Sequence, residues 1–117
     1  MGWTVLIVDD HAGFRASARA LLEADGFEVL GEAADGPSAL AQVQRLRPQV
    51  VLLDVQLPGM DGFAVADRLA ATPAAPVVVL ISSRERGTFR TRLAAAPARG
   101  FITKSEFSGE SLSLVLA

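Results

Sequence analysis

The clearest fold signal in this chain is VVLLDVQLPGMDG, residues 50–62. Its apolar start ends at a carboxylate and leads into a proline–glycine turn, a pattern typical of a strand that is buried on both faces. We place that strand at 49–53. The beginning of the chain repeats the pattern, because the apolar run 3–8 is closed by Asp9-Asp10. Both runs therefore predict strands inside a covered sheet.

Three more strands and five helical segments complete the pattern. The further strands are expected at 27–33, 76–81 and 100–103. Apolar residues at helical spacing predict helices around 14–22, 40–46, 63–69 and 112–116. Gly36 is expected to cap the second of these helices, with Pro37 in its first turn. The segment 84–96 is expected to be a helix with ragged ends, because its glycine and threonines are poor helix formers.

Regular alternation of strand and helix predicts the α/β class, with a doubly wound, parallel five-stranded sheet, helices on both faces and right-handed crossovers. With 117 residues, the chain is expected to be a single domain covering 1–117. In such sheets, ligands bind beyond the carboxyl ends of the strands. That edge is where we look for a functional site.

Polar side chains end four of the five expected strands, so the parallel sheet brings them to one edge. Carboxylates only about 4 Å apart repel by roughly 4 kcal/mol at an effective dielectric constant of about 20, so such a cluster favours a bound cation. With hard oxygen ligands, no cysteine and one histidine in the chain, Mg²⁺ or Mn²⁺ is favoured over Zn²⁺. The residues are Asp9, Asp10, Asp54, Ser82, Ser83 and Lys104.

Lys104 is the single lysine among eleven basic residues. A compact point charge on a flexible stem differs from the planar fork of arginine, which suggests that this position needs the former. A cation, an ammonium group and a hydroxyl around a carboxylate describe a place to hold a phosphoryl group on that carboxylate. Aspartate is a known nucleophile in phosphoryl transfer.

Composition excludes several other classes. A net charge of −2 without a basic block argues against nucleic acid as a direct ligand. The absence of cysteine excludes disulfides. No apolar run approaches the roughly twenty residues that a membrane helix needs. No charged and apolar leader opens the sequence, so a cytoplasmic location without membrane contact is expected.

Four blocks in order resemble the receiver domain of two-component response regulators: VLIVDDH (5–11), VLLDVQLPGMDG (51–62), LISS (80–83) and GFITK (100–104). The resemblance runs from Thr4 to about Leu116. It implies a flavodoxin-like (βα)5 fold with strand order 2-1-3-4-5. Each block alone is weak, but four blocks at spacings that place them on one sheet edge are specific.

The resemblance also implies a role for each site residue. Asp54 would accept a phosphoryl group from a phosphohistidine of a sensor histidine kinase or a phosphotransfer protein. Lys104 and Ser82 would bind phosphoryl oxygens. The Mg²⁺ ion would be held by the carboxylates of Asp10 and Asp54 and by the backbone carbonyl of Gln56, with Asp9 acting through bound water. Ser83 and Gln56 at the mouth would tune the lifetime of the acyl phosphate.

Phe101 matches the aromatic residue whose rotamer follows the movement of Ser82. The signal would pass to the face formed by the fourth helix, the fifth strand and the fifth helix, and would change a partner there: a downstream protein, a fused output domain or a second copy of the chain. Ser105 follows Lys104 where many relatives have proline, so no cis peptide bond is expected there.

Other interpretations stay open for single residues and for the whole chain. Asp10 could instead cap the first helix, and Asp61 and Gly62 could start the third. His11 could ligate a metal because it is next to the acids, but it is expected to be an exposed loop histidine. A receiver-like module that signals without phosphorylation is the first alternative function. An aspartyl-phosphate phosphohydrolase is disfavoured, because Gln56 stands where its second aspartate is needed. A flavin or nucleotide site is disfavoured by the acidic loop after the first strand. The chain is therefore expected not to be an enzyme beyond its own phosphorylation and dephosphorylation.

Overall fold

A computed structural model describes residues 2–117 of the protein. The sheet has five strands in the order β2-β1-β3-β4-β5, and every neighbouring pair is parallel. The expected fold and strand order are confirmed. The strands are β1 Thr4–Val8, β2 Glu28–Ala33, β3 Val50–Asp54, β4 Val77–Ser82 and β5 Gly100–Thr103.

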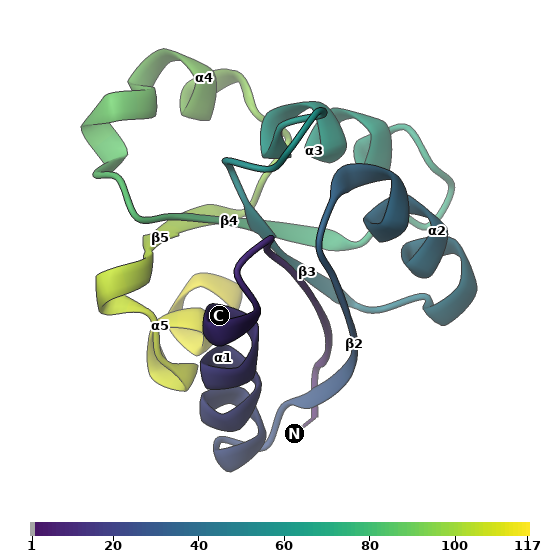
Figure 1. Cartoon of the computed structure of the whole chain (residues 1–117), viewed down its shortest axis with the longest axis vertical. Coiled ribbons are helices and arrows are strands. Elements are labelled where there is room, and N and C mark those ends of the chain that lie inside the picture. Colours follow the sequence, from purple (N-terminus) through teal and green to yellow (C-terminus); the bar gives the residue numbers. More distant parts are fainter. Residues whose placement is uncertain (1) are drawn as a thin grey trace.

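Helices cover both faces of this sheet (Figure 1). α1 and α5 lie on one face, whereas α2, α3 and α4 lie on the other. The α-helices are α1 Ala12–Ala24, α2 Gly36–Leu46, α3 Gly62–Ala70, α4 Arg90–Ala95 and α5 Gly109–Leu116. Two 3₁₀ turns, η1 Arg86–Phe89 and η2 Lys104–Glu106, follow β4 and β5.

The strands are buried on both faces, as their unbroken apolar runs predict. In β1, Val5 and Ile7 pack with α1 and α5, whereas Leu6 and Val8 pack with α2 and α3. All four side chains are fully buried. Since burying one such side chain contributes about 1.5–3 kcal/mol, the central strands form a stable base for whatever follows their carboxyl ends.

Helix starts differ from the expectation at two places. Asp35, rather than Gly36, caps α2, because its carboxylate accepts a hydrogen bond from the Ser38 N–H at 2.8 Å. The interpretation of Asp10 as the cap of α1 is wrong, since His11 occupies that position. The expectation that Asp61 starts α3 is confirmed: its side chain accepts from the Ala64 N–H at 3.0 Å.

The segment after β4 is ragged, as its composition predicts. It consists of the short η1 turn followed by the six-residue α4, and neither contributes a buried residue. No cis peptide bond occurs within residues 2–117, which agrees with the expectation for Lys104-Ser105. Over the same residues, no helix is both long enough and apolar enough to cross a lipid bilayer.

Candidate functional site at the carboxyl edge of the sheet

The carboxyl ends of β1, β3 and β5 bring charged residues from distant parts of the chain together. Asp9 and Asp10 directly follow β1, Asp54 is the last residue of β3, and Lys104 directly follows β5. Each of Asp9, Asp10, His11 and Asp54 offers one ligand atom, and these four atoms all lie within 4.8 Å of one another. The gathering expected from the strand pattern is therefore present.

Asp54 is held in place by its own backbone surroundings. The residue is only 2% exposed. Its Oδ1 accepts a hydrogen bond from the Gln56 N–H at 3.2 Å. The Gly62 N–H donates to the Val55 carbonyl at 2.8 Å, and a Cβ atom at Gly62 would collide with the Asp54 carbonyl oxygen. Only glycine therefore lets α3 begin this close to the end of β3.

Burial and a neighbouring charge disfavour the ionised form of Asp54. Burial, followed by repulsion from the Asp9 carboxylate, raises the pKa of Asp54 from 3.8 to about 6. The Gln56 N–H and the Lys104 ammonium oppose this shift and do not cancel it. The Asp54 carboxylate is thus ionised at neutral pH, although the neighbouring Asp9 carboxylate repels its charge.

Lys104 lies between the two buried carboxylates. Its Nζ is 2.6 Å from Asp9 Oδ2 and 3.4 Å from Asp54 Oδ2. The same ammonium lies 4.7 Å from the centroid of the Phe14 ring, within cation–π range. Lys104 is only 15% exposed, so it is an internal cation of the site.

The acidic group fits a divalent cation. Asp9 is fully buried, and the Lys104 ammonium is the one charged group placed against its Oδ2 among the described residues, at 2.6 Å. Buried carboxylate oxygens are costly unless a cation compensates them. A hard oxygen set of this kind suits Mg²⁺ or Mn²⁺. Asp10 and Asp54 supply two further carboxylates to the same place.

His11 faces the acids, although its side chain is 69% exposed. Its Nδ1 lies 3.1 Å from Asp9 Oδ1 and 3.1 Å from Asp10 Oδ1. Its backbone N–H donates to Asp9 Oδ1 at 2.8 Å. The expectation of an exposed loop histidine therefore describes its exposure but misses its contacts.

Ser82 ends β4 and is fully buried. Its hydroxyl oxygen accepts a hydrogen bond from the Arg84 N–H at 3.0 Å. Ser83 and Gln56 are exposed. Ser82 directly follows Ile81, which is the partner of Asp54 in the β3–β4 pair, so its buried hydroxyl belongs to the same edge of the sheet.

Phe101 lies in β5 under an arginine and a second phenylalanine. It is 5% exposed, and the Arg86 guanidinium is 5.3 Å from its ring centroid. The same guanidinium donates to the Phe101 carbonyl at 3.0 Å. Phe89 packs against Phe101 with ring centroids 6.3 Å apart. The ring is therefore turned inward and covered by η1.

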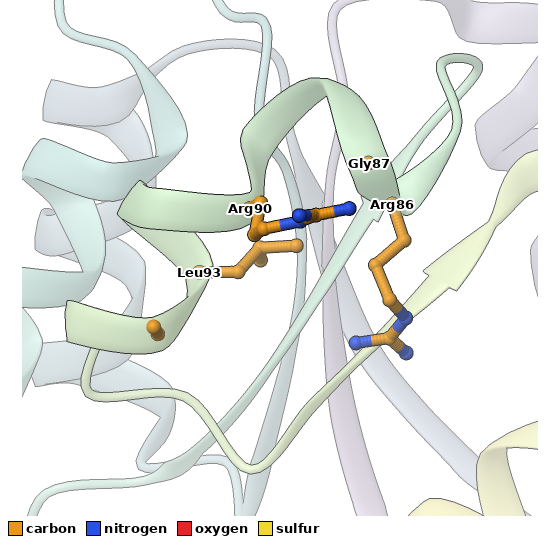
Figure 2. Close-up of a pocket in the computed structure, with 5 residues that line it drawn as sticks. Arg86, Gly87, Arg90 and Leu93 are labelled. Carbon is orange, nitrogen blue, oxygen red and sulfur yellow. The ribbon is translucent and has the colours of Figure 1, made fainter.

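A second depression lies on η1 and α4, apart from the acids. It measures about 390 Å³ and is lined by Arg86, Gly87, Arg90, Leu93 and Ala94. Figure 2 shows the Arg86 and Arg90 side chains at its rim. None of its lining residues belongs to the acidic cluster.

A family model for the response regulator receiver domain matches residues 5–115 of the chain. The chain belongs to this receiver family. It is 36% identical over 112 residues to the response regulator GacA of Pseudomonas protegens, covering 95% of this chain and 53% of that protein. It is 33% identical over 101 residues to the DNA-binding transcriptional activator EvgA of Escherichia coli K12, covering 86% of this chain and 50% of that protein.

Solved structures agree with this family. The signal receiver domain of NarL from Mycobacterium tuberculosis superposes with a TM-score of 0.86 at 34% identity, over 98% of this chain and 94% of that chain. A LuxR-family two-component response regulator from Aurantimonas gives a TM-score of 0.86 at 27% identity, over 97% and 81%. The receiver domain described here spans about half the length of the curated relatives it matches.

Sequence reasoning missed two contacts around the receiver site. Phe14 under the Lys104 ammonium and Arg86 over Phe101 were not anticipated. The place of His11 directly after two aspartates indicated a metal ligand as the less favoured alternative, and its ring nitrogen does face the acids. For Phe14 and Arg86, periodicity assigns no partner, because the contacts join elements far apart in the chain.

Proposed function

We propose that this receiver domain accepts a phosphoryl group on Asp54 from a phosphohistidine of a sensor histidine kinase or a phosphotransfer protein, in the cytoplasm, and that residues 1–117 act as one unit in doing so. The observation that carries the proposal is the surrounding of Asp54. A buried carboxylate at a strand end lies against Lys104 at 3.4 Å, beside the acids Asp9 and Asp10.

In the proposed step, an Asp54 carboxylate oxygen attacks the phosphorus of the donor. The new P–O bond forms as the P–N bond breaks, and the released imidazole of the donor takes up a proton. The step needs an ionised carboxylate, which a pKa of about 6 provides at neutral pH. Positioning and charge neutralisation supply most of the rate in such transfers.

Asp10, Asp54 and the backbone carbonyl of Gln56 would hold Mg²⁺ or Mn²⁺, and Asp9 would act through bound water. When bound, the cation neutralises negative charge on the carboxylates and on the incoming phosphoryl group. Lys104 lies within reach of Asp54 and is proposed to move its ammonium from Asp9 to a phosphoryl oxygen.

The response is proposed to begin at Ser82. Phosphorylation adds charge and acceptor oxygens to Asp54 and attracts the Ser82 hydroxyl, which gives up its hydrogen bond from the Arg84 N–H. That exchange pulls on the segment preceding η1, which covers Phe101. The face formed by α4, β5 and α5 then changes its affinity for a downstream protein, a fused output domain or a second copy of the chain.

Some relatives carry DNA binding in their names, and they are about twice as long as this chain. We assign protein contact, and no nucleic acid contact, to the receiver domain itself, since its net charge is −2. We also propose that it turns over no separate substrate, so a phosphomonoester offered to the protein should remain intact.

Intact-mass spectrometry after incubation with a small acyl-phosphate donor tests the proposal. We expect one phosphoryl adduct that requires Mg²⁺ and is absent from Asp54→Asn. Glu28→Gln is the matched control, because this exposed carboxylate starts β2 at the opposite edge of the sheet and should leave the adduct in place. An adduct that persists in Asp54→Asn contradicts the assignment. No adduct in a protein that binds Mg²⁺ would favour signalling without phosphorylation.

A further inference from the structure

His11 occupies the N-cap position of α1, but its side chain makes no capping hydrogen bond. Residues with short oxygen-bearing side chains are usual there, because they accept from the first free N–H groups of the helix. The imidazole turns the other way, toward Asp9 and Asp10. Its position is thus unrelated to helix capping and requires another explanation.

The distances match those of a coordination sphere. In an octahedral site with bonds of about 2.1 Å, neighbouring ligand atoms are separated by about 3.0 Å. His11 Nδ1 lies 3.1 Å from Oδ1 of Asp10, a proposed ligand of the cation, and 3.1 Å from Oδ1 of Asp9, which would act through bound water. One ligand atom each from Asp9, Asp10, His11 and Asp54 lies within 4.8 Å of the others. The imidazole nitrogen therefore stands where an additional ligand would stand.

The charge balance also points to a cation at the same place. Asp9 is fully buried, and its Oδ2 meets the Lys104 ammonium at 2.6 Å. The Lys104 ammonium balances one charge, but three carboxylates converge here. The cluster thus carries more negative charge than its own cation compensates.

We propose that His11 Nδ1 is a direct ligand of the divalent cation, and that the site therefore prefers first-row transition cations such as Co²⁺ and Mn²⁺ over Mg²⁺. The inference rests on the cation site of the proposed function and adds to it a residue that determines selectivity. Imidazole nitrogen binds transition cations well, whereas Mg²⁺ strongly prefers oxygen ligands. His11 would thus widen the difference between these cations beyond that of a purely carboxylate site.

A simpler role for His11 is a hydrogen bond from Nδ1–H to the two carboxylates, which would only orient them. Such a role affects all divalent cations to the same degree. Direct ligation affects only those that accept nitrogen. The ratio of affinities for Co²⁺ and Mg²⁺ therefore distinguishes the two roles.

The test uses the chain without an affinity tag, because His11 is its only histidine and it has no cysteine. Calorimetric titration with Co²⁺ and with Mg²⁺ is made on the native protein, His11→Gln and His11→Ala. We expect both variants to lose Co²⁺ affinity by about tenfold or more, and Mg²⁺ affinity by less than about threefold. Circular dichroism verifies folding, which we expect to persist because the His11 backbone N–H that bonds Asp9 is retained.

A spectroscopic measurement addresses ligation directly. With Mn²⁺ bound, pulsed electron paramagnetic resonance should show ¹⁴N modulation from a coordinated imidazole in the native protein and none in His11→Gln. Equal losses for Co²⁺ and Mg²⁺, no loss for either, or no nitrogen modulation would overturn the inference. Phosphorylation in Mg²⁺ is measured in parallel. Phosphorylation without the His11-dependent cation preference would contradict only this inference. The cation preference without phosphorylation would contradict only the proposed function.

Discussion

The acidic edge and the η1–α4 segment are built in opposite ways. The acids follow strands whose side chains are almost entirely buried, and Asp9 and Asp54 are themselves buried. In contrast, η1 and α4 contribute no buried residue, and only Phe89 and Leu93 pack partly against the core. The site is therefore held by the main core, whereas the neighbouring segment is held by a few side chains.

The side chains of this segment join two core phenylalanines in a row of three rings with a cation at each end. Arg86 covers Phe101, Phe89 lies between Phe101 and Phe63, and the Arg92 guanidinium lies 4.2 Å from the centroid of the Phe63 ring. Arg92 also pairs with Asp61 at 2.8 Å. Each contact contributes on the order of 1 kcal/mol or less. The charged residues of the site therefore lie on a firmly packed base, whereas the segment beside it can rearrange at low free-energy cost.

The largest effect on stability is expected for Gly62→Ala, at the place where α3 begins against the end of β3. Its Cβ would collide with the Asp54 carbonyl, and β3 is too buried to shift. We expect the free energy of unfolding to fall by about 3 kcal/mol, measured by urea denaturation. Gly13→Ala is the matched control: nothing lies within 4 Å of the added atom, so this α1 substitution should stabilise by about 0.5 kcal/mol. Equal changes in the free energy of unfolding for the two variants would contradict the close approach of Gly62 to the Asp54 carbonyl.

Asp54→Asn removes a buried charge that its surroundings disfavour. In the cation-free domain at pH 7.5, it should raise the free energy of unfolding by about 2 kcal/mol. Burial raises the pKa of Asp54 from 3.8 to about 6, so the folded protein binds a proton more tightly than the unfolded chain. The native protein therefore loses stability as pH rises from about 4 to 6, and the variant does not. Urea denaturation in chelator across this range measures the difference, which should vanish near pH 4. If the stabilisation by Asp54→Asn did not change with pH, the charge of Asp54 would not be its cause.

In the η1–α4 segment, Arg86→Gln should lower the free energy of unfolding by about 1 kcal/mol. The variant loses the contact with the Phe101 ring and the hydrogen bond to the Phe101 carbonyl. Amide hydrogen exchange should become faster in η1 and α4 and stay unchanged in β1 and β3. Arg90→Gln is the control, because Arg90 lines the same depression without either contact. Faster exchange throughout the sheet would show that the two regions are not separate.

The smallest effect is expected for Arg92→Gln, about 0.5 kcal/mol, because its ion pair with Asp61 is largely exposed. Burial alone would raise the pKa of Asp61, but hydrogen bonds from the Ala64 N–H and from Arg92 outweigh it and lower the pKa. The pair thus adds stability above the ordinary aspartate range and loses it as pH falls below. Thermal denaturation should show a larger difference at pH 7 than at pH 3, because the contact of Arg92 with the Phe63 ring does not titrate.

Several features were readable from the chain itself. Unbroken apolar runs closed by Asp9, Asp54 and Lys104 placed three strands and their charged ends, because parallel strands end at one edge. Four ordered blocks indicated the family and its strand order. The ragged segment 84–96 followed from poor helix formers.

Side-chain partners were decided only by the tertiary structure. The pairing of Lys104 with Asp9 at 2.6 Å, the turn of the His11 ring toward the acids, and the cover of Arg86 over Phe101 could not be read from periodicity. Periodicity reports which face of an element is apolar, and strand pattern reports where a polar residue ends a run. Which atoms then meet depends on the angles and distances between elements far apart in sequence, and these are set by packing of the whole core.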